Sequence, residues 1–150
     1  MKIRSHLCSE RRVQGTLVAR LDYPESVMRK ALKILAVDDE PSITESMRFI
    51  FESPRYQVTS AQDGNDALSQ LAADPNTYDV VITDNNMPNV SGVELVQKLR
   101  ERSFAGKIMV LSAHLSSDLR KAYKEMAVDA MIDKPFDVQE LRKTLDMVAA

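Results

Sequence analysis

Charged side chains follow three apolar segments of this chain, at the point where each segment ends. They are Asp38 and Asp39 after residues 33–37, Asp84 after residues 79–83, and Lys134 after residues 130–132. In an open parallel sheet, the carboxyl ends of the strands line the crevice in which ligands bind. If the three segments are neighbouring parallel strands, three carboxylates and one ammonium group meet in that crevice.

The charges of such a cluster indicate its chemistry. Carboxylates that are held close together repel one another unless a cation lies among them, and Mg²⁺ prefers oxygen ligands. Lys134 then becomes a point-charge partner for a phosphoryl oxygen. These residues therefore predict a magnesium-dependent site that transfers a phosphoryl group.

The elements that would place these residues alternate between strand and helix, with short connections. The expected strands are residues 33–37, 57–61, 79–83, 107–112 and 130–132. Apolar stripes at helical spacing follow the strands, and the β-branched run 80–82 is typical of a central strand buried on both faces. The alternation predicts an α/β fold, (βα)5, with a parallel five-stranded sheet and helices on both faces.

Several residues indicate where the helices begin and which side faces inward. Pro41 suits the first turn of the first helix, and Asp137 with Glu140 reads as a capping box for the last one. The expected inward stripe of the fourth helix is Leu115, Leu119, Ala122 and Met126.

Four motifs occur in order at the ends of the first, third, fourth and fifth expected strands. They are Ile34-Leu35-Ala36-Val37-Asp38-Asp39-Glu40-Pro41, Asp84-Asn85-Asn86-Met87-Pro88 with Ser91-Gly92, Leu111-Ser112-Ala113, and Lys134-Pro135-Phe136. Together they resemble the receiver domain of bacterial two-component response regulators over residues 33–150. The resemblance implies a flavodoxin-like, doubly wound sheet with strand order 2-1-3-4-5.

The resemblance also implies a role for each acidic residue. Asp84 is expected to be the phosphoacceptor, forming an aspartyl phosphate. Asp39 and Asp84 are expected to bind Mg²⁺ directly, with the backbone carbonyl of Asn86, while Asp38 reaches the ion through water. An acidic pair before a helix can instead cap its N-terminus, which is the simpler interpretation of Asp38 and Asp39.

Three further residues follow from the same resemblance. Lys134 is expected to hold a phosphoryl oxygen, Pro135 to form a cis bond with it, and Ser112 to donate its hydroxyl to the phosphorylated aspartate. The simpler alternatives are a surface lysine that pairs with Asp133 and an ordinary loop serine. Together the residues imply self-catalysed phosphotransfer and autodephosphorylation.

The sequence departs from the family pattern at two places, and a further position of interest, His114, varies within the family. Met131 stands where the family usually has an aromatic residue whose rotamer reports phosphorylation. Methionine can fill or vacate a pocket but has no hydroxyl that could exchange hydrogen-bond partners, and simple core packing is an equal alternative. The fourth helix is expected to end in Met126-Ala127-Val128, where the family commonly has a glycine, and a left-handed cap there would be strained without one. His114, which borders the expected site, is a candidate with Asn86 for tuning the phosphoryl lifetime; a surface role is the alternative.

Composition limits the classes of function. The 150 residues fit one domain, preceded by a basic extension, residues 1–32, that is expected to be mobile. Residues 34–150 hold 12 basic and 19 acidic residues, so direct DNA binding by this part is not expected. Cys8 is the only cysteine, and neither a membrane span nor a secretory signal is recognisable, so a cytoplasmic location is expected.

The expected function is a signalling switch that receives its phosphoryl group from a histidine kinase. Since the sequence ends at the last expected helix, we expect a stand-alone, chemotaxis-type receiver that binds its target through helix four, strand five and helix five. That face includes Lys121, Lys124, Glu125 and Arg142. The alternatives are a phosphorelay carrier to a histidine phosphotransfer protein and a degenerate receiver that acts as a constitutive binding module.

Two other classes on similar sheets fit the sequence poorly. A phosphatase with an aspartyl nucleophile needs two aspartates separated by one residue after the first strand, and Asp38-Asp39-Glu40 lacks that spacing. A flavin carrier needs a Ser/Thr/Gly-rich phosphate loop at the same place, and none follows the first strand.

Overall fold

The structure, a computed structural model, describes residues 12–13, 16–17 and 30–150. The chain divides into two compact units, and the second comprises Ala31–Ala150. In the first unit, β1 (Arg12–Val13) and β2 (Thr16–Leu17) pair as short antiparallel strands. The expected mobility of residues 1–32 falls mainly on residues outside those described, so it stays a prediction.

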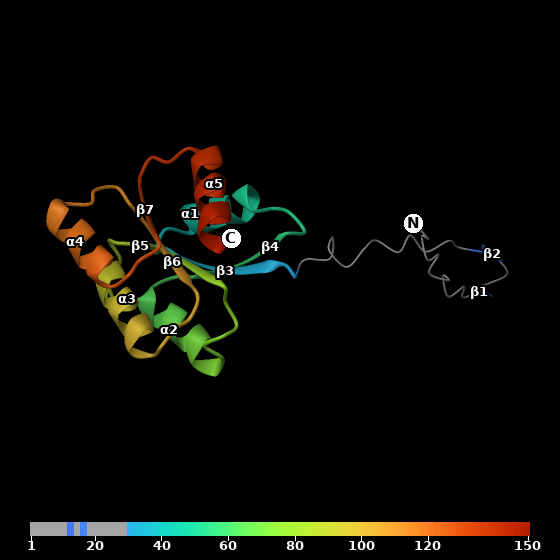
Figure 1. Ribbon diagram of the computed structural model, residues 1–150, viewed down its shortest axis with the longest axis horizontal. Coiled ribbons are helices and arrows are strands. Elements are labelled where there is room, and N and C mark those ends of the chain that lie inside the picture. Colours follow the sequence, from blue (N-terminus) through green and yellow to red (C-terminus); the bar gives the residue numbers. More distant parts are fainter. Residues whose placement is uncertain (1–11, 14–15, 18–29) are drawn as a thin grey trace, which may run out of the picture. The chain divides into compact units, whose positions relative to one another are not determined.

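The second unit is a parallel five-stranded sheet whose strands alternate with helices (Figure 1). Its elements are β3 (Leu32–Val37), α1 (Pro41–Ile50), β4 (Tyr56–Ala61), α2 (Gly64–Ala73), β5 (Val80–Asp84), α3 (Gly92–Glu101), β6 (Lys107–Ser112), α4 (Ser117–Glu125), β7 (Ala130–Asp133) and α5 (Val138–Ala149). The strand order β4-β3-β5-β6-β7 is 2-1-3-4-5 when counted from Leu32, which confirms the predicted fold.

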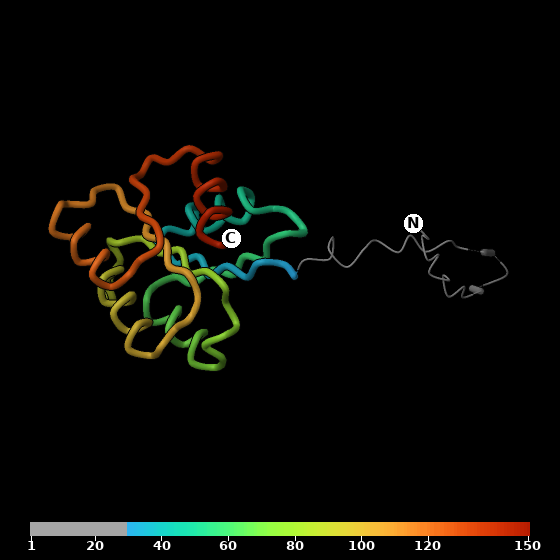
Figure 2. Tube along the Cα trace, in the orientation of Figure 1, coloured from blue at the N-terminus to red at the C-terminus, as the bar shows by residue number. Residues whose placement is uncertain are grey.

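Helices cover both faces of this sheet, as the tube in Figure 2 also shows. Helices α1 and α5 pack on one face through side chains such as Met47 and Leu145, and α2, α3 and α4 cover the other. Every residue of β5 is buried, as expected for a strand with neighbours on both sides and helices on both faces. Within the described residues, no helix has the length and apolar character needed to cross a bilayer.

The helix starts follow the local sequence. Pro41 lies in the first turn of α1, and Asp137 caps α5 by accepting hydrogen bonds from the backbone N–H groups of Gln139 and Glu140. The predicted capping box at Asp137 and Glu140 is therefore only half formed in the described chain. The complete box lies at α3, where Ser91 and Glu94 bond each other's backbone.

The end of α4 adopts the left-handed cap that the absence of a glycine in residues 126–128 makes strained. Ala127 has a φ of 56°, in the left-handed region that costs a side-chain-bearing residue about 1–2 kcal/mol. The Arg100 guanidinium of α3 holds this turn by donating hydrogen bonds to the carbonyls of Met126, at 2.9 Å, and Ala127, at 2.7 Å. The link between α3 and the end of α4 offsets the strain.

Replacing Ala127 by glycine is expected to stabilise the protein by about 1 kcal/mol, because glycine adopts this φ without a steric cost. Urea unfolding measures the change. Glycine at Ala122, inside α4, is the matched control and is expected to destabilise by about 1 kcal/mol. A loss of stability in Ala127→Gly would contradict the expectation.

Candidate functional site

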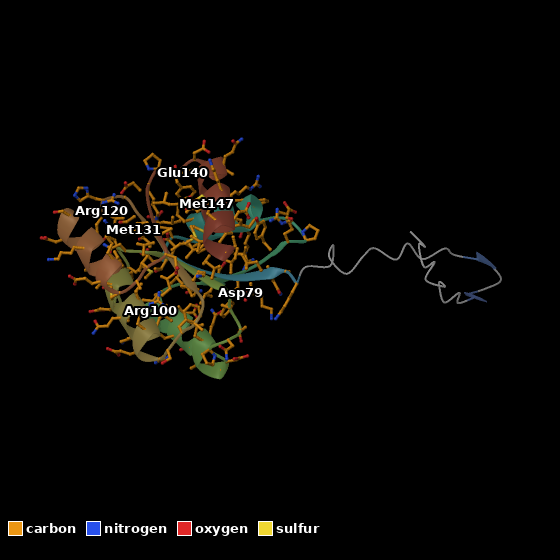
Figure 3. The ribbon with its side chains drawn as sticks, viewed as in Figure 1. Asp79, Arg100, Arg120, Met131, Glu140 and Met147 are labelled. Carbon is orange, nitrogen blue, oxygen red and sulfur yellow. The ribbon has the colours of Figure 1, made fainter. Side chains whose placement is uncertain are left out.

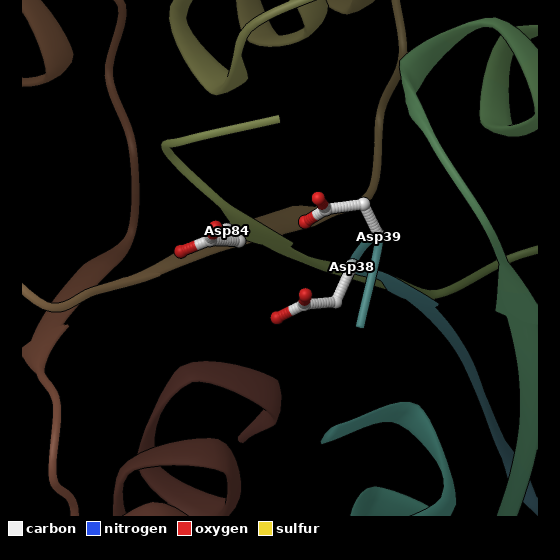
Figure 4. Close-up of side chains that lie close together, drawn as sticks. All are labelled: Asp38, Asp39 and Asp84. Atoms are coloured by element: carbon white, nitrogen blue, oxygen red, sulfur yellow. The ribbon is translucent and has the colours of Figure 1, made fainter. Parts of the chain in front are cut away.

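Three carboxylates gather at the carboxyl edge of the sheet. Strands β3 and β5 are parallel neighbours with Val37 opposite Thr83, so the residues that end or follow them reach the same edge. Oxygens of Asp38, Asp39 and Asp84 all lie within 4.8 Å of one another (Figure 4). Asp38 and Asp84 are buried and Asp39 is exposed, so the cluster opens to solvent on one side.

Lys134 completes the cluster from the end of β7. Its Nζ lies 3.0 Å from Oδ2 of Asp38 and 3.3 Å from Oδ1 of Asp84, and its backbone N–H donates to the Ser112 carbonyl at 2.8 Å. The Lys134–Pro135 peptide bond is cis, as the resemblance implied. Asp133 does not hold this lysine: it pairs with Arg120 of α4 at 2.7 Å, so the surface-pair interpretation is wrong.

The charges at this edge shift the acid–base behaviour of two groups. Burial raises the pKa of the Asp84 carboxyl, Lys134 opposes this rise in part, and the neighbouring charge of Asp38 adds to it. Burial disfavours the Lys134 ammonium, but hydrogen bonds and charges from Asp38 and Asp84 outweigh it, so the pKa of Lys134 is raised. Lys134 therefore stays charged, and three carboxylates share one cation.

This donor set fits a magnesium ion. One ammonium cannot neutralise three carboxylates, and all three offer the oxygen ligands that Mg²⁺ prefers. Asp39, the most exposed of the three, leaves the cluster accessible. Capping of α1 does not explain the pair, because the N-cap position is Glu40, which makes no side-chain cap bond.

The structure places the other predicted site residues on β6, on β7 and on the loops that follow β5 and β6. Ser112 ends β6 and is fully buried, and its hydroxyl is 3.4 Å from the backbone N of His114. His114 and Asn86 are exposed, and Met131 is half-buried against the core under α2, α3 and α4. Met131 is labelled among the side chains in Figure 3. A hollow of about 400 Å³ beside the cluster is lined by Asp39, Asn85, Asn86, Met87, Pro88, Ser91, Val93 and Leu119.

Sequence reasoning missed two residues next to the site. Asn85 is buried beside Asp84, and its side-chain carbonyl accepts a hydrogen bond from the hydroxyl of Tyr123. The predicted inward stripe of the fourth helix omitted Tyr123, yet this is the buried residue of α4. The available signal was the position of Asn85 directly after a buried strand, because a buried polar side chain needs a hydrogen-bond partner.

Comparison with known proteins agrees with this geometry. Residues 34–146 match the response regulator receiver domain. The chain belongs to this family. Because the match covers every strand of the large unit except the first residues of β3, the receiver domain spans nearly all of Ala31–Ala150.

Relatives of this receiver domain differ in overall size. It is 36% identical over 110 residues to the response regulator MprA of Mycolicibacterium vanbaalenii, covering 73% of this chain and 47% of that protein. It is 31% identical over 118 residues to the sensor histidine kinase RcsC of Salmonella typhi, covering 79% of this chain and 12% of that protein. The chain thus spans about half the length of the first relative and far less of the second.

Solved structures share the fold. The chemotaxis protein CheY4 of Vibrio cholerae is 32% identical, with a TM-score of 0.72 over 79% of this chain and 98% of that one. A response regulator receiver domain protein from Clostridium thermocellum is 28% identical, with a TM-score of 0.69 over 79% of this chain and 94% of that one. Relatives of several lengths leave the expected stand-alone organisation a prediction.

Replacing Asp84 by asparagine is expected to stabilise the protein at pH 7 in the presence of a chelator, by on the order of 1 kcal/mol. The folded pKa of Asp84 lies above its ordinary value of 3.8, so its ionisation costs stability at neutral pH. The cost fades as the pH falls through the folded pKa towards 3.8, and the gain from asparagine should fade with it. Urea unfolding across this range measures the difference.

The exposed carboxylate of Glu52 provides the control for charge removal. Glu52→Gln should leave stability nearly unchanged at both ends of the pH range. An Asp84→Asn variant that is less stable than the wild type at pH 7 would show that the Lys134 contact outweighs burial and repulsion.

Proposed function

We propose that this receiver domain is a phosphorylatable switch of a two-component system, with Asp84 as the phosphoacceptor. The observation that carries the proposal is the position of the Lys134 ammonium, 3.0 Å from Asp38 and 3.3 Å from Asp84, within a cluster of three carboxylates. A cation in this position favours negative charge at the oxygen of Asp84 and on a phosphoryl group transferred to it.

In the proposed reaction, a carboxylate oxygen of Asp84 attacks the phosphorus of a phosphohistidine on the kinase. The new O–P bond forms as the P–N bond breaks. The electron pair of the P–N bond returns to the imidazole nitrogen. Lys134 holds a phosphoryl oxygen throughout, so the protein contributes mainly positioning and charge neutralisation. Later attack by water returns the carboxylate and releases phosphate.

A magnesium ion is part of this proposal. Asp39, Asp84 and the backbone carbonyl of Asn86 would hold it, with Asp38 acting through water. When bound, the ion supplies positive charge to the phosphoryl oxygens. Asp38 would also orient Lys134, since its Oδ2 accepts a hydrogen bond from the Lys134 ammonium group.

The proposed output is a change at the face formed by α4, β7 and α5. Phosphorylated Asp84 would draw the Ser112 hydroxyl inward, and Met131 would fill or vacate the space next to it. The change shifts a pre-existing equilibrium at that face, where a protein target binds. The proposal includes a cytoplasmic location and no direct DNA contact by residues 33–150, whose charge is acidic.

Two other functions remain as alternatives on the same site. A phosphorelay carrier would pass the group from Asp84 to a histidine phosphotransfer protein instead of holding it while a target binds. A degenerate receiver would bind its partner without phosphorylation. The complete acidic cluster with its paired lysine favours a working site over the degenerate one.

Incubation with acetyl phosphate is expected to add one phosphoryl group to the wild type only when Mg²⁺ is present, because the charge on the acidic cluster otherwise repels the donor. Intact-mass spectrometry measures the adduct. Asp84→Asn should show none, and Lys134→Met should react at least about tenfold more slowly, since it loses a charge partner for the phosphoryl group.

The control is Ser112→Ala, which should still be phosphorylated because the serine acts after transfer. Absence of an adduct in folded wild-type protein would contradict the switch and support the degenerate alternative. Loss of the adduct on addition of a histidine phosphotransfer protein would support the carrier.

Replacing His114 by alanine is expected to change the autodephosphorylation rate severalfold, because its exposed side chain stands two residues after Ser112 and would control the access of water to the phosphoryl group. The decay of the adduct over time measures this rate. Alanine at exposed Lys121, on α4, is the control and should leave the rate as it is. Identical decay in His114→Ala and the wild type would remove this role.

A further inference from the structure

Helix α4 inserts one fully buried side chain into the body of the domain. Tyr123 is fully buried and is the buried residue of this helix, whereas its other residues are half-buried or exposed. Its ring lies in the core under α2, α3 and α4. Its hydroxyl reaches past the core to residues 85–91, the loop that follows Asp84 and is here called the phosphoacceptor loop.

The Tyr123 hydroxyl connects to the loop through a short chain of hydrogen bonds. It donates to Oδ1 of Asn85, and Nδ2 of Asn85 donates to Oδ1 of Asn86 at 3.2 Å. The carbonyl of Asn85 also accepts a bond from the Gly92 N–H at 2.9 Å. This series of hydrogen bonds thus begins on α4 and ends on Asn86, whose backbone carbonyl is the proposed magnesium ligand.

The packing around Gly92 shows how close this contact is. A Cβ atom there would lie 2.5 Å from the Asp84 carbonyl oxygen, 2.7 Å from the Tyr123 hydroxyl and 2.8 Å from the Cα of Asn85. Only a residue without a side chain leaves room for the hydroxyl beside the loop backbone. The Tyr123 hydroxyl and the backbone of Asp84 and Asn85 therefore both lie close to Gly92, and a side chain there would clash with both.

Electrostatics fix the direction of this bond. Burial, and to a smaller extent the charge of Asp84, raise the pKa of Tyr123, so the hydroxyl stays protonated and acts as a donor. If α4 moved outward, Oδ1 of Asn85 would lose its partner in a buried setting, which is costly. Helix and loop therefore move together.

We propose that Tyr123 is a positioning residue that couples the phosphoacceptor loop to helix α4 through Asn85. The inference rests on the proposed function, because it concerns the same magnesium site. Coupling free energies are reciprocal, so a ligand that orders the loop must also change α4, and removal of the hydroxyl must weaken both effects. The link supplies a route to the output face that does not need an aromatic residue at position 131.

The test is a magnesium titration of the full chain followed by two-dimensional ¹H–¹⁵N NMR. In the wild type, amides of the Asn86 loop and of α4 should respond with one common dissociation constant. In Tyr123→Phe, the affinity measured at the loop should fall about fivefold, and the α4 amides should lose most of their response. Tyr78→Phe is the matched control, since it removes a hydroxyl bonded to Gln70 and should behave as the wild type.

A second variant separates positioning from stability. Tyr123→Phe combined with Asn85→Leu leaves no orphaned acceptor, so stability should recover while the α4 response stays lost. A normal α4 response in either Tyr123→Phe or the double variant, with the wild-type magnesium affinity, would overturn the coupling alone. A wild type with no magnesium response at the loop would overturn the metal site of the proposed function as well.

Discussion

The excess of negative charge at the carboxyl edge of the sheet is the constraint on which this domain depends. Asp38, Asp39 and Asp84 crowd within 4.8 Å, and Lys134 supplies one compensating charge. Burial and repulsion hold the Asp84 pKa up, so the free domain stores an unfavourable interaction at the residue that is proposed to react. A divalent cation relieves the repulsion, which ties metal binding to the local structure.

Sheet topology creates this crowding. The order β4-β3-β5-β6-β7 places the ends of β3 and β5 side by side, and β6 pairs with β7 so that Lys134 returns to the same edge. The ion pair between Lys134 and Asp38 joins residues 96 positions apart. Parallel strands separated by helices bring such distant residues together at a single edge, which is why ligand sites gather there.

Local patterns in the sequence were enough to predict the sheet and its acidic cluster, because apolar runs, turn residues and strand ends are short-range features. Local patterns were not enough to predict the hydrogen-bond partners of single polar groups. Helical spacing selected apolar residues such as Ala122 for the inside of α4, whereas Tyr123 takes that place because Asn85, on another element, accepts its hydroxyl. The capping box was assigned to Asp137, yet the complete one forms at Ser91, where both side chains meet the required backbone.

The same distinction decides which contacts can transmit a change from the cluster to α4. The Arg120–Asp133 pair also joins α4 to β7, but its side chains are 37% and 60% exposed, so water replaces their contact at little cost. The bond between Tyr123 and Asn85 is buried, and breaking it leaves polar atoms without a substitute partner. The Arg100 bonds to Met126 and Ala127 at the end of α4 are part-buried and exposed, respectively. A movement of α4 that breaks the buried Tyr123–Asn85 bond must therefore disturb the loop that follows Asp84.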